Sequence, residues 1–182
     1  MSKAVMLSIR PKWAEKIANG EKTIEVRKTR PKLDTPFKCY IYCTLPKYPH
    51  EDFIATDYPM PQFYGGGKVI GEFTCDRIID AWWDYVPDAI TREVAGGNLE
   101  ALDGTGMTDE ELFSYVGDSM RGHCYGWHIT DLRIYDAPKC LFEFWAERLC
   151  RREPIVFGCG ECCDCDKRPP QSWCYVEAMD NG

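Results

Sequence analysis

The stretch "LSIRPKWAEKIANGEKTIEVRK", residues 7–28, predicts a strand, a short helix and a second strand in succession. It continues an apolar run at 4–9 that is typical of a buried strand. Pro11 at a first turn and Gly20 past the last apolar residue indicate a helix between them. Residues 22–28 then alternate charged and aliphatic side chains with the period of two that a strand requires.

The second of these strands carries an unusual number of charges. Period two gives it two faces: one with Thr23, Glu25 and Arg27, the other with Lys22, Ile24 and Val26. If the aliphatic residues face the core, the charged face opens either to water or to a cleft, and the alternation fits both. Lys22, at the start of the strand, has to curl over the strand's end to join Glu25 and Arg27.

The rest of the chain predicts an α+β fold. Further strands are expected in three stretches: 37–45, 68–83 and 123–136. Residues 88–118 look helical in two pieces, broken around "GGN" (96–98) and "DGTG" (103–106), and Thr108 with Glu111 has the pattern of a capping box. Residues 141–149 fit either a strand or a short helix. Because the elements do not alternate as βαβ units would, we expect a strongly bent or barrel-like mixed sheet.

Length and charge narrow the class of protein. The chain has 182 residues, 45% of them hydrophobic, which is enough for one domain with a real core. No apolar run approaches the roughly 20 residues needed to span a bilayer, and the N-terminus reads as a strand and not as a signal peptide, so we expect a cytoplasmic protein. The net charge of −7 argues against coating of nucleic acid by charge alone. It leaves room for a local site that binds one nucleotide or a short strand.

The strand-helix-strand segment resembles the ASCH family of PUA-like domains. The family signature, G-x-K-x-x-E-x-R, is present as Gly20, Lys22, Glu25 and Arg27, behind the expected first helix. The resemblance implies a small mixed β-barrel with short helices and a charged cleft beside the barrel mouth. It also implies binding of RNA or of a nucleotide.

The chemistry of these side chains suits such a ligand. Arg27 offers a planar fork of donors for a phosphate or a base edge, and Glu25 can accept from an exocyclic amine. Lys22 supplies a point charge for phosphate. Ser8 and Arg10 could add phosphate donors at the end of the first strand. Aromatic side chains that could stack on an unpaired base are Trp82, Trp83, Tyr125 and Trp127, of which Trp82 completes the predicted nucleotide-binding set.

Two alternatives to simple binding stay open. Some ASCH proteins hydrolyse N4-acetylcytidine, and an enzyme of that kind, or one acting on RNA, would use Lys22 and Glu25 as its catalytic pair. Those amidohydrolases carry a threonine where this chain has Glu25. They also carry a later glutamate, and this chain has Glu100 and Glu110 near that position without a clear match. The other alternative is a protein-interaction module that uses the aromatic surface and the C-terminal tail.

The C-terminal tail is rich in cysteine. Of the 11 cysteines, five lie between residues 159 and 174, and their spacing allows a structural zinc site from Cys159, Cys162, Cys165 and Cys174. A reduced tail is the alternative. We expect residues 1–150 to form the ASCH-like domain and 151–182 an extension that packs on it. The tail resembles the C-termini of phage or prophage ASCH proteins.

Overall fold

In a computed structural model the chain has a mixed α+β fold, described for residues 2–45, 66–85, 94–117, 121–144 and 169–179. The strands are β1 (Lys3–Ile9), β2 (Ile24–Arg27), β3 (Phe37–Cys43), β4 (Lys68–Tyr85), β5 (Val94–Gly97), β6 (Arg121–Lys139) and β7 (Trp173–Glu177). The helices are α1 (Pro11–Ala18) and α2 (Asp109–Val116), with 3-10 turns at Leu99–Leu102 and Leu141–Phe144.

The seven strands form a mixed sheet. Their order is β2-β6-β4-β3-β1-β7, with β5 paired to β4. β1 pairs in parallel with β3 and antiparallel with β7. In the described residues this order is open, ending at β2 and β7, and closure into a barrel stays a prediction. The chain divides into two compact units, to both of which the long strands β4 and β6 contribute.

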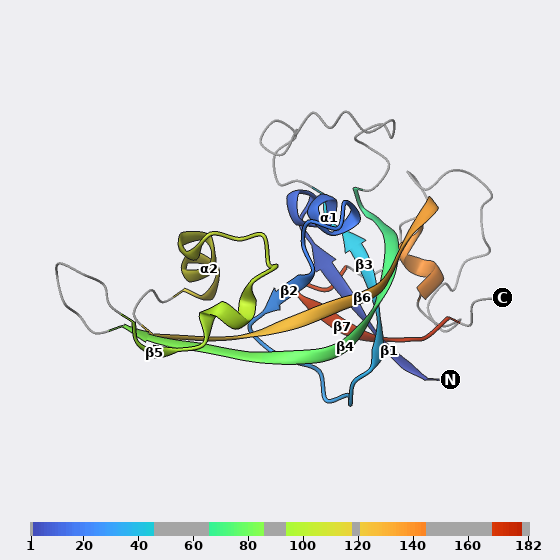
Figure 1. The fold of residues 1–182 in the computed structure, drawn as a ribbon. Helices are drawn as coiled ribbons and strands as arrows, with labels where there is room; N and C mark the ends of the chain where they lie inside the picture. Colours follow the sequence, from blue (N-terminus) through green and yellow to red (C-terminus); the bar gives the residue numbers. More distant parts are fainter. Residues whose placement is uncertain (1, 46–65, 86–93, 118–120, 145–168, 180–182) are drawn as a thin grey trace. The chain divides into compact units, whose positions relative to one another are not determined.

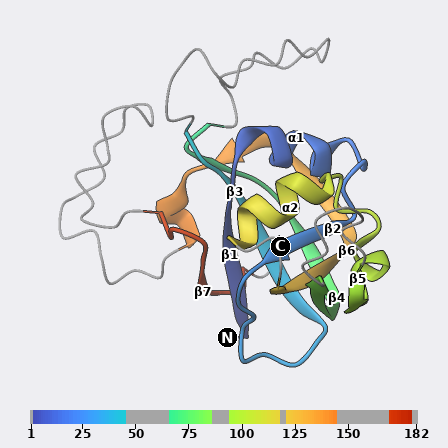
Figure 2. The same ribbon diagram turned by 90° about the vertical axis from the view of Figure 1, so that its left-hand side faces the viewer.

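Unit 1 takes its described residues from 2–15, 38–73 and 132–179. β1 lies between β3 and β7 (Figure 2), and each of its residues from Ala4 to Ile9 is buried, as the continuous apolar run predicts. The core of this unit gathers side chains from five strands and the second 3-10 turn: Ala4, Met6, Tyr40, Tyr42, Val69, Tyr135, Phe144 and Val176.

Unit 2 comprises 16–37 and 74–131, with the strand order β2-β6-β4-β5. α2 and the turn at 99–102 lie on one side of these strands (Figure 1). Beneath them is a second core of Ile24, Val26, Ala81, Trp83, Leu102, Leu112 and Cys124. The indole of Trp83 lies so close to Gly122 that a Cβ at Gly122 would overlap the ring. Glycine is therefore required there for packing.

Most of the predicted elements are confirmed, and two are revised. The capping box forms, since the Thr108 side chain accepts from the Glu111 N–H and the Glu111 carboxylate accepts from the Thr108 N–H. The sequence predicts a helical piece that breaks around residues 96–98, whereas residues 94–97 form β5, because their backbone pairs with β4. Of the ambiguous 141–149 stretch, the part at Leu141–Phe144 is a 3-10 turn.

Two predictions about domains and membranes meet the structure only in part. The expected boundary between residues 150 and 151 lies outside the described residues and stays a prediction. No helix in the described part of the chain is long and apolar enough to cross a membrane.

Candidate functional site

The turn between α1 and β2 sets the position of the charged strand. Gly20 takes a left-handed conformation, with φ of +76°, and its N–H donates to the Ile17 carbonyl. The Lys22 N–H then donates to the Lys16 carbonyl over 3.0 Å. These two bonds close the end of the helix and turn the chain directly into β2, so the Gly20–Lys22 spacing fixes where the lysine side chain begins.

Lys22, Glu25 and Arg27 form one buried ion-pair cluster, which we call the charged cluster. The Glu25 carboxylate lies between the two cations: Oε2 is 3.4 Å from Lys22 Nζ, and Oε1 is 2.9 Å from an Arg27 terminal nitrogen. The three residues are only 2%, 6% and 6% exposed. Lys22 does curl toward Glu25 as expected. β2 is nevertheless buried on both faces, so the solvated strand face that the alternation allowed is wrong.

A loop far away in sequence completes the cluster. Lys22 Nζ donates to the Thr105 carbonyl over 2.7 Å, and Lys16 Nζ donates to the Gly106 carbonyl over 3.0 Å. The carbonyl of Gly104 accepts the backbone N–H groups of Thr23 and Ile24. Gly104 has φ of +99°, and a Cβ there would overlap the Thr23 hydroxyl. Three successive carbonyls of the loop therefore fasten the start of β2 and the last turn of α1.

Burial dominates the electrostatics of the cluster. Desolvation lowers the pKa of Lys22 below its ordinary value of 10.5, against the opposing attraction of Glu25. Arg27 and Lys16 lower that pKa further, because both are cations. Burial also raises the pKa of Tyr115, which hydrogen-bonds to Arg27. The four charged residues Lys16, Lys22, Glu25 and Arg27 thus comprise three cations and one carboxylate.

Sequence reasoning missed two members of this arrangement. The "DGTG" segment was interpreted only as a break between helical pieces, and Tyr115 was not singled out at all. Glycines around Thr105 signal a turn, yet nothing local indicates that the carbonyls of that turn meet Lys22. Tyr115 lies on α2, and its contact with Arg27 depends on the packing of that helix in unit 2.

Two of the predicted site residues lie in unit 1. Ser8 is buried, and its hydroxyl donates to the Pro170 carbonyl. Arg10 is exposed, and its carbonyl accepts from the N–H groups of Trp13 and Ala14 at the first turn of α1. Their roles toward a nucleotide stay predictions.

The aromatic residues separate by exposure. Trp83 and Trp127 are 1% and 0% exposed, so both are core residues and cannot stack on a ligand from outside. Tyr125 is half-buried. Trp82 is 47% exposed. Of the four candidates, Trp82 alone is largely accessible.

The zinc prediction falls largely outside the described residues. Cys159, Cys162 and Cys165 are not described, and Cys174 is a half-buried residue of β7, paired with Met6. In the described part of the chain no group of three His, Cys, Asp or Glu residues could hold a metal ion. Cys140, which lies before the tail, is disulfide-bonded.

Three comparisons relate this chain to known proteins. The model of the ASCH domain family matches residues 7–40, the segment that contains the charged cluster. No curated protein matches the sequence. A Tyr-to-Phe variant of the ASCH protein from Zymomonas mobilis is similar in structure, with a TM-score of 0.57 and 16% identity over 97% of this chain and 91% of that one.

The unsubstituted Zymomonas mobilis ASCH protein gives a TM-score of 0.54 and 17% identity, covering 96% of this chain and 87% of that one. A Ser-to-Ala variant of it gives 0.54 and 16%, covering 96% and 88%. At these identities the structural likeness shows a common fold. The resemblance to the ASCH family is thus seen in the sequence of residues 7–40 and, in structure, as a likeness of fold.

Proposed function

We propose that this protein binds RNA or a nucleotide, with the charged cluster of Lys22, Glu25 and Arg27 as its recognition site. The observation that carries the proposal is the burial of these three charges in one hydrogen-bonded network. Burying charge costs free energy, and groups held in this way are typical of functional sites. The ASCH family model matches this segment, and RNA binding is consistent with that family.

The geometry suits an anionic, hydrogen-bonding ligand. Glu25 fixes the orientation of both cations, so a phosphate or a base edge meets donors that are already positioned. With Lys16 included, cations outnumber carboxylates by three to one in the group. A phosphate would offset that excess.

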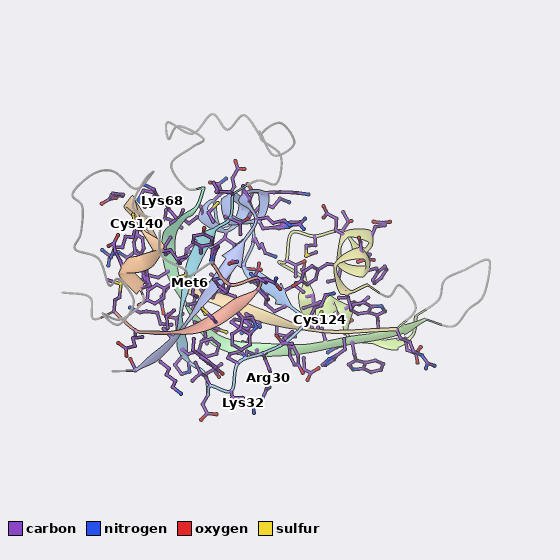
Figure 3. All side chains as sticks on the ribbon, turned by 180° about the vertical axis from the view of Figure 1, so that it is seen from behind. Met6, Arg30, Lys32, Lys68, Cys124 and Cys140 are labelled. Atoms are coloured by element: carbon purple, nitrogen blue, oxygen red, sulfur yellow. The ribbon has the colours of Figure 1, made fainter. Side chains whose placement is uncertain are left out.

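The loop after β2 extends the positive charge. Lys28, Arg30 and Lys32 are all exposed, and Figure 3 shows Arg30 and Lys32 side by side on this loop. A protein of net charge −7 has little general attraction for nucleic acid, so a local run of cations next to the cluster favours phosphate contacts here. We assign the phosphates that flank the recognised nucleotide to these residues.

The test measures binding of mononucleotides and of single-stranded RNA of about ten nucleotides by fluorescence anisotropy. Arg27→Lys keeps the charge and loses the fork, and we expect it to weaken both ligands at least tenfold. The control is Arg133→Lys, an exposed arginine of unit 1, which should bind as the wild type does. Equal affinity of Arg27→Lys and wild type, or no binding by wild type, would overturn the proposal.

A second measurement addresses the loop. Replacing Lys28, Arg30 and Lys32 together by Gln should lower the slope of log affinity against log salt by about 2, since each single-strand phosphate contact contributes about 0.7. An unchanged slope would show that these residues make no phosphate contacts.

One observation favours an enzymatic variant of the same site. Burial lowers the pKa of Lys22, so this lysine gives up its proton more readily than an exposed lysine does, and Glu25 lies 3.4 Å away. We therefore test hydrolysis of N4-acetylcytidine and of RNA with purified protein. Turnover abolished by both Lys22→Met and Glu25→Gln in folded protein would identify an enzyme. Binding without turnover would leave recognition alone, and a protein partner without RNA binding would favour an interaction module.

A further inference from the structure

The outer face of β4 and β6 in unit 2 carries an ordered row of side chains. Arg121 Nε lies 2.9 Å from Asp84 Oδ1, and His123 Nε2 lies 2.5 Å from Asp80 Oδ1. Because alternate residues of a strand share a face, Trp82 projects from the same face as the two aspartates between which it lies. The neighbouring residues Ala81, Trp83 and Cys124 belong to the buried core on the opposite face.

Trp82 is exposed and also firmly held. The backbone N–H of Trp82 donates to Asn98 Oδ1 over 2.9 Å, and the Trp82 carbonyl accepts the backbone N–H of Asn98. Asn98 Nδ2 also donates to the Asp80 carbonyl. The six-membered ring of the indole lies against Gly96, where an added Cβ would come within 3.1 Å of it. The absence of a side chain at Gly96 therefore lets β5 support the ring from one side.

The surroundings of Trp82 favour a flat ligand over a protein surface. Among the described residues of unit 2, Trp82 is the one large hydrophobic residue that is clearly exposed, and stable protein interfaces need a far larger apolar area. The Arg121–Asp84 ion pair and the His123–Asp80 hydrogen bond flank it, and the Arg121 side chain is 79% exposed and able to meet a phosphate. A single indole beside a cation is the arrangement that holds unpaired bases.

The face is also continuous with the charged cluster. Tyr125 is the register partner of Arg27, and paired residues of an antiparallel ladder project from the same face. The Tyr125 ring contacts that of His123, with centroids 4.8 Å apart. By strand register, ring contact and hydrogen bond in turn, the series Arg27, Tyr125, His123, Asp80 thus follows one face to the strand position beside Trp82.

We propose that Trp82 stacks on an unpaired base of a single-stranded RNA that also occupies the charged cluster. This inference rests on the proposed function and makes it more specific, because it names a single strand of at least two nucleotides as the preferred ligand. Stacking supplies affinity without sequence preference, since every base has a π-face.

The test compares Trp82→Ala and Trp82→Phe with wild type, on a mononucleotide and on a single-stranded RNA. We expect Trp82→Ala to weaken RNA binding about tenfold and to leave mononucleotide binding unchanged. Trp82→Phe should retain most of the affinity. The control is Tyr175→Ala, which removes an exposed aromatic residue of unit 1 and should have no effect.

An oligomer with abasic positions separates stacking from phosphate contacts, because Trp82→Ala and wild type should bind it equally. RNA binding that is lost in Arg27→Lys and unchanged in Trp82→Ala would overturn this inference alone. Absence of any binding by wild type would overturn the proposed function and this inference together. If Trp82→Ala weakened binding of the abasic oligomer as much as binding of the intact RNA, stacking would also be excluded.

Discussion

Among the described residues, each unit of this protein buries one glutamate, and the two are held in different ways. In unit 2, Glu25 lies between Lys22 and Arg27, both buried. In unit 1, Glu72 accepts from the Tyr135 hydroxyl over 2.7 Å and lies 3.4 Å from Lys38, whose side chain is 27% exposed. Glu25 thus contacts two buried cations, whereas Glu72 contacts a neutral hydroxyl and a partly exposed cation.

The difference separates the proposed recognition site from a structural contact. The hydroxyl of Tyr135 satisfies Glu72 without a buried cation, and the pKa of Tyr135 is raised by burial and by its bond to the carboxylate. These contacts of Glu72 leave no excess of positive charge for an anionic ligand to neutralise. Glu25 instead orders two cations, which is the condition that makes the charged cluster suitable for an anionic ligand.

The largest expected effect is that of neutralising Glu25. Glu25→Gln leaves two buried cations without their shared counter-charge and should lower the free energy of unfolding by about 3–5 kcal/mol. Glu72→Gln keeps an oxygen for Tyr135 and should cost about 1–2 kcal/mol. Urea denaturation of both variants measures the difference, with the exposed Glu177→Gln as control. Equal losses would remove the distinction between the two carboxylates.

Removal of the Tyr135 hydroxyl tests the hydrogen bond that this neutral group donates to Glu72. Tyr135→Phe leaves Glu72 buried without its shortest hydrogen bond and should cost about 1–3 kcal/mol in the same assay. The double variant Tyr135→Phe with Glu72→Gln should lose less than the sum of the two single losses, because the residues are in contact. Strict additivity would show that the bond contributes nothing to stability.

Lys22→Met tests how the contribution of the charged cluster to stability depends on pH. Because the pKa of Lys22 is lowered in the folded protein, the unfolded chain binds more protons between that value and 10.5. The stability of wild type relative to Lys22→Met should therefore rise with pH through this alkaline window. Urea denaturation at a series of pH values measures it, and a parallel pair of curves would mean that burial does not shift the lysine. At neutral pH we expect a difference of about 1 kcal/mol.

The smallest effect should come from Lys38. Lys38→Met removes a cation that is partly hydrated, so the change in stability should be below about 1 kcal/mol and should shrink in added salt. A loss as large as that of Glu25→Gln would show that Glu72 depends on its cation after all.

Much of the fold near the site could be predicted from the sequence. Pro11 and Gly20 bracket α1, the alternation from residue 22 marks β2, and Thr108 with Glu111 starts α2. These signals are local, so each is determined by a few neighbouring side chains. The strand β5 was not predicted, because its structure comes from pairing with β4 and not from a local signal.

The sequence by itself determined that Lys22, Glu25 and Arg27 can meet, since three- and two-residue spacings on one short segment keep their side chains within reach. Only the tertiary structure decided that these three side chains are buried. That required β6 beside β2 and the carbonyls of residues 104–106 at the start of the strand. Tertiary structure likewise decided that Trp82 is exposed and its neighbour Trp83 buried, because alternation places them on opposite faces without saying which face the core covers.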